Sequence, residues 1–244
     1  QEGAEEVSNG SFSQEGSELI LNGDFSSDTD WTKGDGWSIS NGFAKSDGSQ
    51  SSFSSIYQDY NLTVGKTYKI TFNLSDYISG LIRPLLDGTD IGAQYVSSNG
   101  NYIFYAKATS STNKLGVRCD ADFIGSIDNV SVKEVGQDWT LGSGWSIGED
   151  KTVLTNVGYN INCTQANVTT IGQYYKIEFT ILDYISGQIR ISLGGSATSL
   201  VSANGTYVFY LQATINNVLV LQPLAASGTN LSITNISVKE VGQN

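Results

Sequence analysis

Apolar and polar residues alternate along several short segments of the chain. In residues 68–74, every second residue is apolar and the residues between them are polar. The same alternation returns in residues 175–181 and, over a shorter length, in residues 130–133. Strict alternation indicates strands with one buried face, and turn signals such as Asn99-Gly100 separate the short strands. No stretch has a convincing apolar period of 3.6 residues, so we predict an all-β fold.

The second half of the chain repeats the first half, and such a repeat governs the interpretation of the whole fold. The segment Trp31-Thr-Lys-Gly-Asp-Gly-Trp37-Ser-Ile returns as Trp139-Thr-Leu-Gly-Ser-Gly-Trp145-Ser-Ile. Three further segments return in the same order: 76–83 as 183–190, 99–105 as 204–210, and 129–137 as 235–243. Many short strands in each unit favour a sandwich or jelly roll. We therefore predict two tandem β-sandwich (jelly-roll) domains at 18–136 and 137–244, after an N-terminal extension at 1–17.

The second repeat lacks the strand with which the first repeat opens. The first repeat begins at residues 18–25 with Glu-Leu-Ile-Leu-Asn-Gly-Asp-Phe, whereas Trp139 comes only three residues after Gly136, where the first repeat ends. A spare copy of the missing segment, Glu-Glu-Val-Ser-Asn-Gly-Ser-Phe, occupies residues 5–12. We predict that this strand completes a second repeat. The donor residues expected to make the contacts are Val7, Asn9, Ser11 and Phe12.

One pair of polar positions agrees with this assignment. The first repeat has Asp24 in its opening segment and Asp128 in its closing strand. The corresponding positions are Ser11 in the spare strand and Thr234 in the second repeat. A carboxylate left alone would carry an uncompensated charge, whereas Ser and Thr can share a neutral hydrogen bond. We therefore expect Thr234 to be the acceptor-side partner of Ser11.

The spare strand has two possible destinations. If it completes the second repeat of a neighbouring copy, the chains join head to tail by donor-strand complementation, and a contact that does not close gives a filament. Burial of Val7 and Phe12 contributes only about 3–6 kcal/mol before ordering costs, so a filament would also need contacts between whole domains. Alternatively, the strand folds back into its own chain, because the six steps from Phe12 to Glu18 span up to about 20 Å.

Composition narrows the classes of partner and the compartment. The chain has 244 residues and a net charge of −11, with 13 basic and 24 acidic residues. Nucleic-acid affinity rests on clustered Lys and Arg, so nucleic acid is not an expected partner. The chain has no run of about 20 apolar residues, which is the length that a helix needs to span a membrane. The absence of Met and His suggests a processed, secreted protein whose signal peptide has been removed, and hence an extracellular or virion-surface location.

The residue types also argue against catalysis. A chain without His cannot form the usual serine or cysteine triads, and phosphate loops and zinc spacings are absent. We therefore predict that the protein is not an enzyme. Cys119 and Cys163 occupy non-equivalent places in the repeats, and either a disulfide or two buried thiols is compatible with the sequence.

A family resemblance follows from four motifs of the first repeat. They are Leu21-Asn-Gly-Asp-Phe25, Gly36-Trp37, the segment Leu-Thr-Val-Gly-Lys-Thr-Tyr-Lys-Ile-Thr-Phe at 62–72, and Ser-Ile-Asp-Asn-Val-Ser-Val at 126–132. This set resembles the family 4/9 type of carbohydrate-binding module, a galactose-binding-like jelly roll found in polysaccharide-degrading enzymes, bacterial surface proteins and phage fibres. The resemblance is weaker in the second repeat, which lacks the Asn-Gly-Asp-Phe entry. Fold resemblance does not by itself identify a ligand.

The resemblance implies one metal site. In such modules a structural calcium ion often lies between the opening and closing strands, and the matching residues here are Asp24 and Asp128. Two carboxylates with backbone carbonyls can satisfy calcium, whereas the alternative is that both side chains accept hydrogen bonds from turn amides. Apart from this calcium we expect no cofactor.

The element Asp-Tyr-Ile-Ser-Gly-x-Ile-Arg, common to both repeats, offers candidate glycan-binding residues. An aromatic ring can stack on sugar C–H bonds and Arg can donate to hydroxyls, which would involve Tyr77, Arg83, Tyr184 and Arg190. The alternative is a strand-turn-strand corner in which Tyr packs and Arg pairs with Asp. The four Trp residues are expected to anchor the cores.

The sequence therefore favours a secreted structural subunit that assembles head to tail into an extracellular filament, with residues 5–12 completing the second repeat of a neighbour. Its partners would be copies of itself. The alternative function is a non-catalytic carbohydrate-binding module of a cell-surface or phage fibre protein, whose partners would be glycans.

Overall fold

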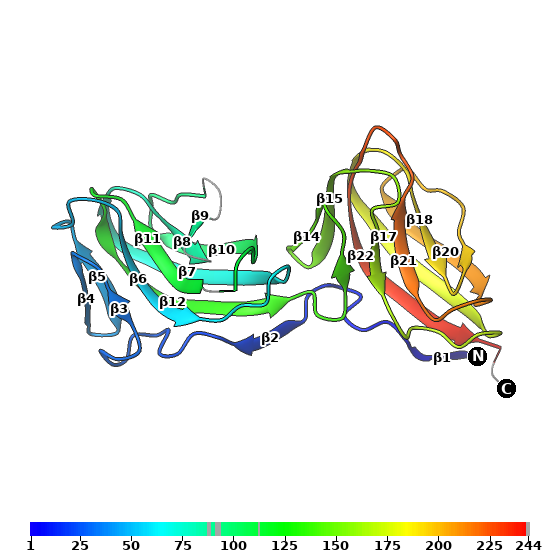
Figure 1. The fold of residues 1–244 in the computed structure, drawn as a ribbon, viewed down its shortest axis with the longest axis horizontal. Helices are drawn as coiled ribbons and strands as arrows, with labels where there is room; N and C mark the ends of the chain where they lie inside the picture. The colour runs from blue at the N-terminus through cyan, green and yellow to red at the C-terminus, as the bar shows by residue number, and fades with distance from the viewer. Residues whose placement is uncertain (87–88, 91–93, 112, 243–244) are drawn as a thin grey trace. The chain divides into compact units, whose positions relative to one another are not determined.

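The computed structural model describes residues 1–86, 89–90, 94–111 and 113–242. Every regular element in this part of the chain is a β-strand (Figure 1), which confirms the predicted all-β class. Because the described residues form no helix, they include no helical membrane span. The alternation of apolar and polar residues explains the long strands at 67–79 and 174–186, since burial alternates along most of their length.

The chain divides into two compact units that do not follow the order of the sequence. The first-repeat unit is Glu15–Val135, and the second-repeat unit combines Gln1–Gln14 with Gly136–Asn244. The whole first repeat is thus inserted into the second, between its opening segment and its body. The division also places residues 15–17 in the first-repeat unit instead of the predicted extension, because Glu15 pairs there with Val135.

Each unit is a sandwich of two antiparallel sheets. In the first-repeat unit, one sheet has the order β10-β7-β12-β5-β4, with β2 paired to β12, and the other has the order β3-β6-β11-β8-β9. The strands of the first sheet are β2 (Glu15–Glu18), β4 (Trp37–Ser40), β5 (Phe43–Asp47), β7 (Thr67–Ser79), β10 (Gly100–Lys107) and β12 (Ile124–Val135). Those of the second are β3 (Thr32–Lys33), β6 (Ser54–Tyr60), β8 (Ile82–Leu86), β9 (Thr89–Asp90) and β11 (Asn113–Cys119).

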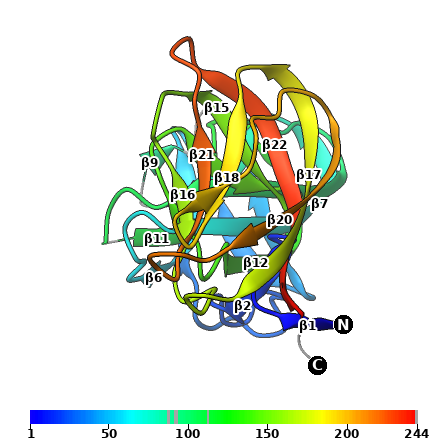
Figure 2. The ribbon, with the colours of Figure 1, turned by 90° about the vertical axis from the view of Figure 1, so that its right-hand side faces the viewer.

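The second-repeat unit has the same topology. One sheet has the order β14-β15-β22-β17-β20, with β1 paired to β22, and the other has the order β13-β16-β21-β18-β19. The first contains β1 (Glu2–Glu5), β14 (Trp145–Gly148), β15 (Lys151–Val157), β17 (Tyr174–Ser186), β20 (Gly205–Gln212) and β22 (Thr229–Val241). The second contains β13 (Thr140–Leu141), β16 (Cys163–Gln165), β18 (Ile189–Leu193), β19 (Ser196–Ala197) and β21 (Leu219–Pro223). Figure 2 shows the long strands β17 and β22 side by side.

The core of each sandwich consists of the residues that the alternation assigned to the buried faces. In β7 and β17, Tyr68, Ile70, Phe72, Leu74, Tyr175, Ile177, Phe179 and Ile181 are almost completely buried. The four Trp side chains are also buried, as expected: Trp31, Trp37, Trp139 and Trp145. Burial of such large apolar side chains is the main favourable contribution to the stability of each unit.

The two cysteines are free thiols buried in different units. Cys119 lies in β11 and Cys163 in β16. Burial raises the pKa of Cys119 to about 11 and also raises the pKa of Cys163. Of the two arrangements compatible with the sequence, the structure contains the pair of thiols.

These thiols are expected to be inert while the chain is folded. The thiolate is the reactive form, and raised pKa values keep both groups protonated at pH 8. An Ellman assay should therefore detect no thiol in the native chain and two in denaturant. Rapid labelling of either cysteine under native conditions would show that its thiol is not buried in solution.

Candidate functional site

The predicted donor segment lies on the second repeat of its own chain. Strand β1 pairs antiparallel with β22, with Glu2 opposite Val241 and Glu5 opposite Lys239 (Figure 1). This is the intramolecular destination of the two that the sequence left open. We call residues 2–12 the opening segment of the second-repeat unit, and residues 15–25 the opening segment of the first-repeat unit.

The predicted strand at 5–12 needs correction, because pairing ends at Glu5 and residues 8–11 form a turn. Asn9 has a φ of 50°, in the left-handed region that Asn tolerates. Gly10 follows directly against the backbone of Ile236, whose N–H donates to the Gly10 carbonyl at 2.9 Å. An extended strand cannot continue through this turn.

Two donor side chains are buried as anchors. Phe12 is 1% exposed, and its ring centroid lies 5.0 Å from that of Trp139. The indole N–H of Trp139 donates to the carbonyl of Asn9 at 3.1 Å. Val7 is 7% exposed. The opening segment therefore supplies part of the core of the second-repeat unit.

The predicted hydrogen bond between the side chains of Ser11 and Thr234 is not formed. The Thr234 hydroxyl donates to the carbonyl of Asp150 at 2.7 Å and lies 3.5 Å from the carbonyl of Ser11. The Ser11 hydroxyl instead contacts Ser13 at 2.7 Å. The two positions are neighbours as expected, but the turn directs the Ser11 side chain away from Thr234.

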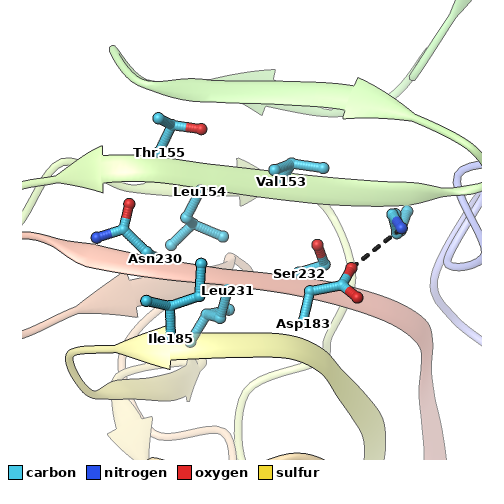
Figure 3. Close-up of a pocket in the computed structure, with 9 residues that line it drawn as sticks. Val153, Leu154, Thr155, Asp183, Ile185, Asn230, Leu231 and Ser232 are labelled. Carbon is cyan, nitrogen blue, oxygen red and sulfur yellow. Dashed lines mark ion pairs between the residues drawn. The ribbon is translucent and has the colours of Figure 1, made fainter.

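A groove of about 380 Å³ crosses three strands of the second-repeat unit. Figure 3 shows its lining, which comes from β15, β17 and β22. The lining residues are Lys151, Val153, Leu154, Thr155, Asp183, Ile185, Asn230, Leu231 and Ser232. A volume of this size suits a small ligand, or one or two units of a polymer.

The charged end of the groove is an ion pair. Lys151 Nζ lies 3.0 Å from Asp183 Oδ2 and 3.2 Å from Glu149 Oε2. The hydrogen bond to Asp183 raises the pKa of Lys151, and the same bond, with a further one from Ser232, lowers the pKa of Asp183. Both groups thus remain charged across neutral pH and offer a donor and an acceptor side by side.

The other end combines an amide with an exposed aliphatic side chain. Asn230 donates from Nδ2 to Ser186 Oγ at 3.0 Å and accepts from the N–H of Asn156 at 2.9 Å. Ile185 is 79% exposed. Its counterpart in the first-repeat unit, Ile78, is 71% exposed. An aliphatic side chain held in water at the same place of both repeats is not needed for either core.

The shared Asp-Tyr-Ile-Ser-Gly element explains how these Ile residues are exposed. Asp76 and Asp183 adopt φ values of 49° and 52°, which break the regular strand alternation. The hydroxyls of Tyr77 and Tyr184 then donate to the carbonyls of the glycines three residues later, at 3.1 and 3.2 Å. These contacts belong to a strand-turn-strand corner, so both Tyr side chains hold the corner in shape instead of forming an open platform.

The two predicted Arg residues lie in the other sheet of each unit. Arg83 in β8 is 4% exposed and donates to the hydroxyl of Tyr95 at 2.7 Å, with its guanidinium 4.8 Å from that ring. Arg190 in β18 donates from Nε to Gln222 at 2.7 Å. Each Tyr belongs to β7 or β17 of the first sheet. The predicted Tyr–Arg pairs are therefore split between the two sheets of each sandwich.

A second exposed cluster was not predicted. Phe53 is 53% exposed, and the guanidinium of Arg118 lies 4.9 Å from its ring centroid. Arg83 approaches the same ring at 5.8 Å. Phe53 precedes β6 in a segment without alternation, so no periodic signal marked it.

The two residues of the predicted calcium site have local hydrogen-bond partners. Asp24 accepts from the N–H of Ser26 at 3.2 Å, and Asp128 accepts from the N–H and the side-chain amide of Asn129 at 2.6 and 2.9 Å. These contacts match the alternative in which both carboxylates satisfy turn amides. Within the described part of the chain, no three His, Cys, Asp or Glu side chains gather as a metal site would require. Calcium stays a prediction from the resemblance.

Comparison with known proteins gives only structural likenesses. No family model and no curated protein sequence matches the chain. Among solved structures, it is similar to the N-terminal tandem CBM22-1–CBM22-2 domain of Xyn10C from Paenibacillus barcinonensis, at 8% identity over 95% of this chain and 99% of that one, with a TM-score of 0.37. It is also similar to a Paenibacillus xanthan lyase, at 16% identity over 84% of this chain and 24% of that one, with a TM-score of 0.29.

Proposed function

We propose that the chain is a non-catalytic carbohydrate-binding protein and that the groove over β15, β17 and β22 is its main glycan site. The observation that carries this proposal is the recurrence of an Asp–Ser pair beside an exposed Ile in both repeats. In the first-repeat unit, the Ser126 hydroxyl donates to Asp76 at 3.1 Å beside the exposed Ile78. In the second-repeat unit, Ser232 and Asp183 lie together beside the exposed Ile185.

The groove matches the two faces of a sugar ring. Ile185 and Val153 offer apolar surface for C–H groups, and burying that surface is favourable. Lys151, Asp183 and Asn230 offer donors and acceptors for hydroxyls. Each of these polar groups already has a partner in the chain, so a ligand hydroxyl would join existing hydrogen bonds without leaving a buried group unpaired.

The presence of this Asp–Ser–Ile group in both units favours binding to polymers over binding to free monosaccharides. A polysaccharide engaged by one unit presents further sugars to the other at high effective concentration. The net charge of −11 favours neutral or basic glycans over anionic ones. An extracellular place of action, on a cell surface or a phage fibre, is part of this proposal.

Binding should depend on Ile185. We expect Ile185→Ser to weaken binding of the best polysaccharide found on a glycan array by at least about tenfold, the scale of one lost apolar contact. Isothermal titration calorimetry measures the effect. The matched control is Ile215→Ser, because Ile215 is 72% exposed in the same unit but does not line the groove. A blank array for the unmodified chain, or equal effects of the two substitutions, would contradict the proposal.

The head-to-tail filament remains a separate prediction. It requires an empty place on the second repeat of each free copy, whereas the chain fills that place with its own opening segment. A filament would therefore form only if the segment left its own chain and entered the next. Electron microscopy of concentrated native material tests this directly, because filaments are either visible or absent.

A further inference from the structure

The two opening segments bind their units through the same contacts, although only six of their eleven residues are identical. Each segment begins with an acidic residue between two lysines. Glu2 lies 2.8 Å from Lys176 and 3.7 Å from Lys239. In the other unit Glu15 lies 2.5 Å from Lys69 and 2.9 Å from Lys133. The ion pairs of the first Glu with two lysines are thus formed in both units of the molecule.

The second acidic residue of each segment accepts hydrogen bonds from the closing strand of its unit. The carboxylate of Glu5 accepts from the N–H of Val238 at 2.7 Å and from the hydroxyl of Ser237 at 2.5 Å. The carboxylate of Glu18 accepts in the same way from Val132 at 2.9 Å and from Ser131 at 2.5 Å. Charge-assisted bonds of this kind are the strong ones, so they fix the register of each segment.

A buried glutamine from the body of each unit then forms two hydrogen bonds with the backbone in the middle of the segment. The side-chain amide of Gln165, which is 4% exposed, accepts from the N–H of Ser8 at 2.9 Å and donates to its carbonyl at 2.8 Å. Gln58, which is 9% exposed, does the same to Leu21 at 3.1 and 2.5 Å. Because the amide contacts only backbone atoms, this position accepts Ser in one segment and Leu in the other.

The end of each segment is specified by Asn-Gly-x-Phe. Phe12 packs on Trp139 at 5.0 Å and Phe25 packs on Trp31 at 4.9 Å. Each Trp also donates its indole N–H to the carbonyl of the segment's Asn, at 3.1 and 2.9 Å. The glycine between them has no room for a side chain in either unit, because a Cβ at Gly10 or Gly23 would overlap a backbone carbonyl of the closing strand.

We infer that the surface beneath residues 2–12 is a peptide-binding site for the pattern Glu-Gly-x-Glu-x-apolar-x-Asn-Gly-x-Phe, and that it takes this pattern from a second copy of the chain once its own segment is released. We call this surface the opening-segment site; its main residues are Trp139, Gln165, Lys176, Ile236, Ser237, Val238 and Lys239. The pattern is the set of positions that make equivalent contacts in both units.

Chain connectivity makes such exchange feasible. The opening segment is joined to the rest of its unit only through Glu15–Val135, which is a complete sandwich with its own core. Only Val7 and Phe12 among its residues are buried. The segment can therefore leave without unfolding the first-repeat unit. In dilute solution each site binds the segment of its own chain in preference to that of a second copy, because a tethered segment has a high effective concentration.

The first test keeps every residue of the chain. A protease site is inserted between Ser13 and Gln14 and then cut, so that the opening segment is held by its contacts alone. A fluorescent peptide of residues 1–13 should then bind the cut chain and not the uncut chain at micromolar concentration, as measured by fluorescence anisotropy. If cutting releases the segment and the second-repeat unit loses its near-UV circular dichroism signal, added peptide should restore that signal.

Competing peptides test the pattern. An unlabelled peptide of residues 14–26, from the first repeat, should compete within about tenfold of the 1–13 peptide, whereas the 1–13 peptide with Phe12→Ala should compete at least 100-fold less well. Failure of the 1–13 peptide to bind the cut chain would overturn the inference. Equal competition by the Phe12→Ala peptide would also overturn it.

Exchange between copies is tested with two full-length variants. A Phe12→Ala chain has a weakened segment and an intact opening-segment site, whereas a Trp139→Ala chain has an intact segment and a defective site. Their mixture should form a heterodimer in sedimentation velocity, and neither variant should dimerise alone. A mixture that stays monomeric would overturn the role of the second copy.

Discussion

Replacing Phe12 with alanine is expected to destabilise the second-repeat unit by about 3–5 kcal/mol and to leave the first-repeat unit unchanged. Phe12 is at the far end of the chain from the body of that unit, yet it is 1% exposed against Trp139. Its removal leaves a cavity beside the indole that the turn at residues 8–11 cannot fill. Hydrogen exchange with mass spectrometry in a urea series measures the stability of each unit separately.

Phe25→Ala is the matched control for this prediction. Phe25 packs on Trp31 in the first-repeat unit with nearly the same geometry. It should destabilise the first-repeat unit by a similar amount and spare the second. If Phe12→Ala instead weakened the first-repeat unit, or weakened neither, residues 1–14 would not be part of the second-repeat unit.

Gly10→Ala is expected to detach the end of the opening segment. The added Cβ would overlap the carbonyl oxygen of Ile236, which is backbone of a bulge in the central strand β22, held on either side by the pairs Ser237–Glu178 and Thr234–Thr180. The segment must shift, which breaks the bond from the Ile236 N–H to Gly10 and loosens Phe12. We expect a loss of about 2–4 kcal/mol, combining overpacking with a partly lost apolar anchor.

Gly3→Ala provides the control within the same segment. A Cβ at Gly3 would lie 3.4 Å from the carbonyl oxygen of Glu240, which is an ordinary contact. Its effect on the second-repeat unit should stay within about 0.5 kcal/mol. The measurement is the urea midpoint followed by the fluorescence of a chain in which Trp31 and Trp37 are replaced by Phe. Equal midpoints for Gly10→Ala and Gly3→Ala would contradict the close packing at Gly10.

The sandwich architecture was predictable because the alternation of apolar and polar residues that produces it is visible in the sequence. A strand with one buried face must alternate, and residues 68–74 and 175–181 do so without exception. The spare opening segment was predictable for a similar reason. A repeat that lacks one segment leaves unpaired backbone and an open core, and only a copy of that segment can fill both.

The destination of the segment could not be read from the sequence. Phe12 would contact Trp139 in the same way whether both belonged to one chain or to two, so matching residues carry no information about connectivity. The turn at residues 8–11 interrupts the strand predicted at 5–12, and its local sequence signal is Asn9-Gly10.

The groove could not be predicted because its lining converges from three strands far apart in the sequence. Lys151, Asp183 and Asn230 carry no motif that joins them. Only the recurrence of Ile78 and Ile185 within the shared element gave a sequence signal. Of the two interpretations of this element, the contacts of Tyr77 and Tyr184 match the strand-turn-strand corner.

Residues 1–14 complete the second repeat of their own chain, and an engineered disulfide can capture this pairing covalently. Glu2 and Val241 are opposite each other in the ladder of β1 and β22, where the Cα spacing of about 4.5–5.5 Å suits a disulfide. Glu2→Cys with Val241→Cys should be oxidised in dilute protein, with Glu15→Cys and Val135→Cys as the corresponding pair in the first repeat. Mass spectrometry of the non-reduced protein should find a monomer with residues 2 and 241 linked. Disulfide-linked dimers or ladders, or two thiols that remain unlinked, would show that the opening segment does not pair with β22 of its own chain.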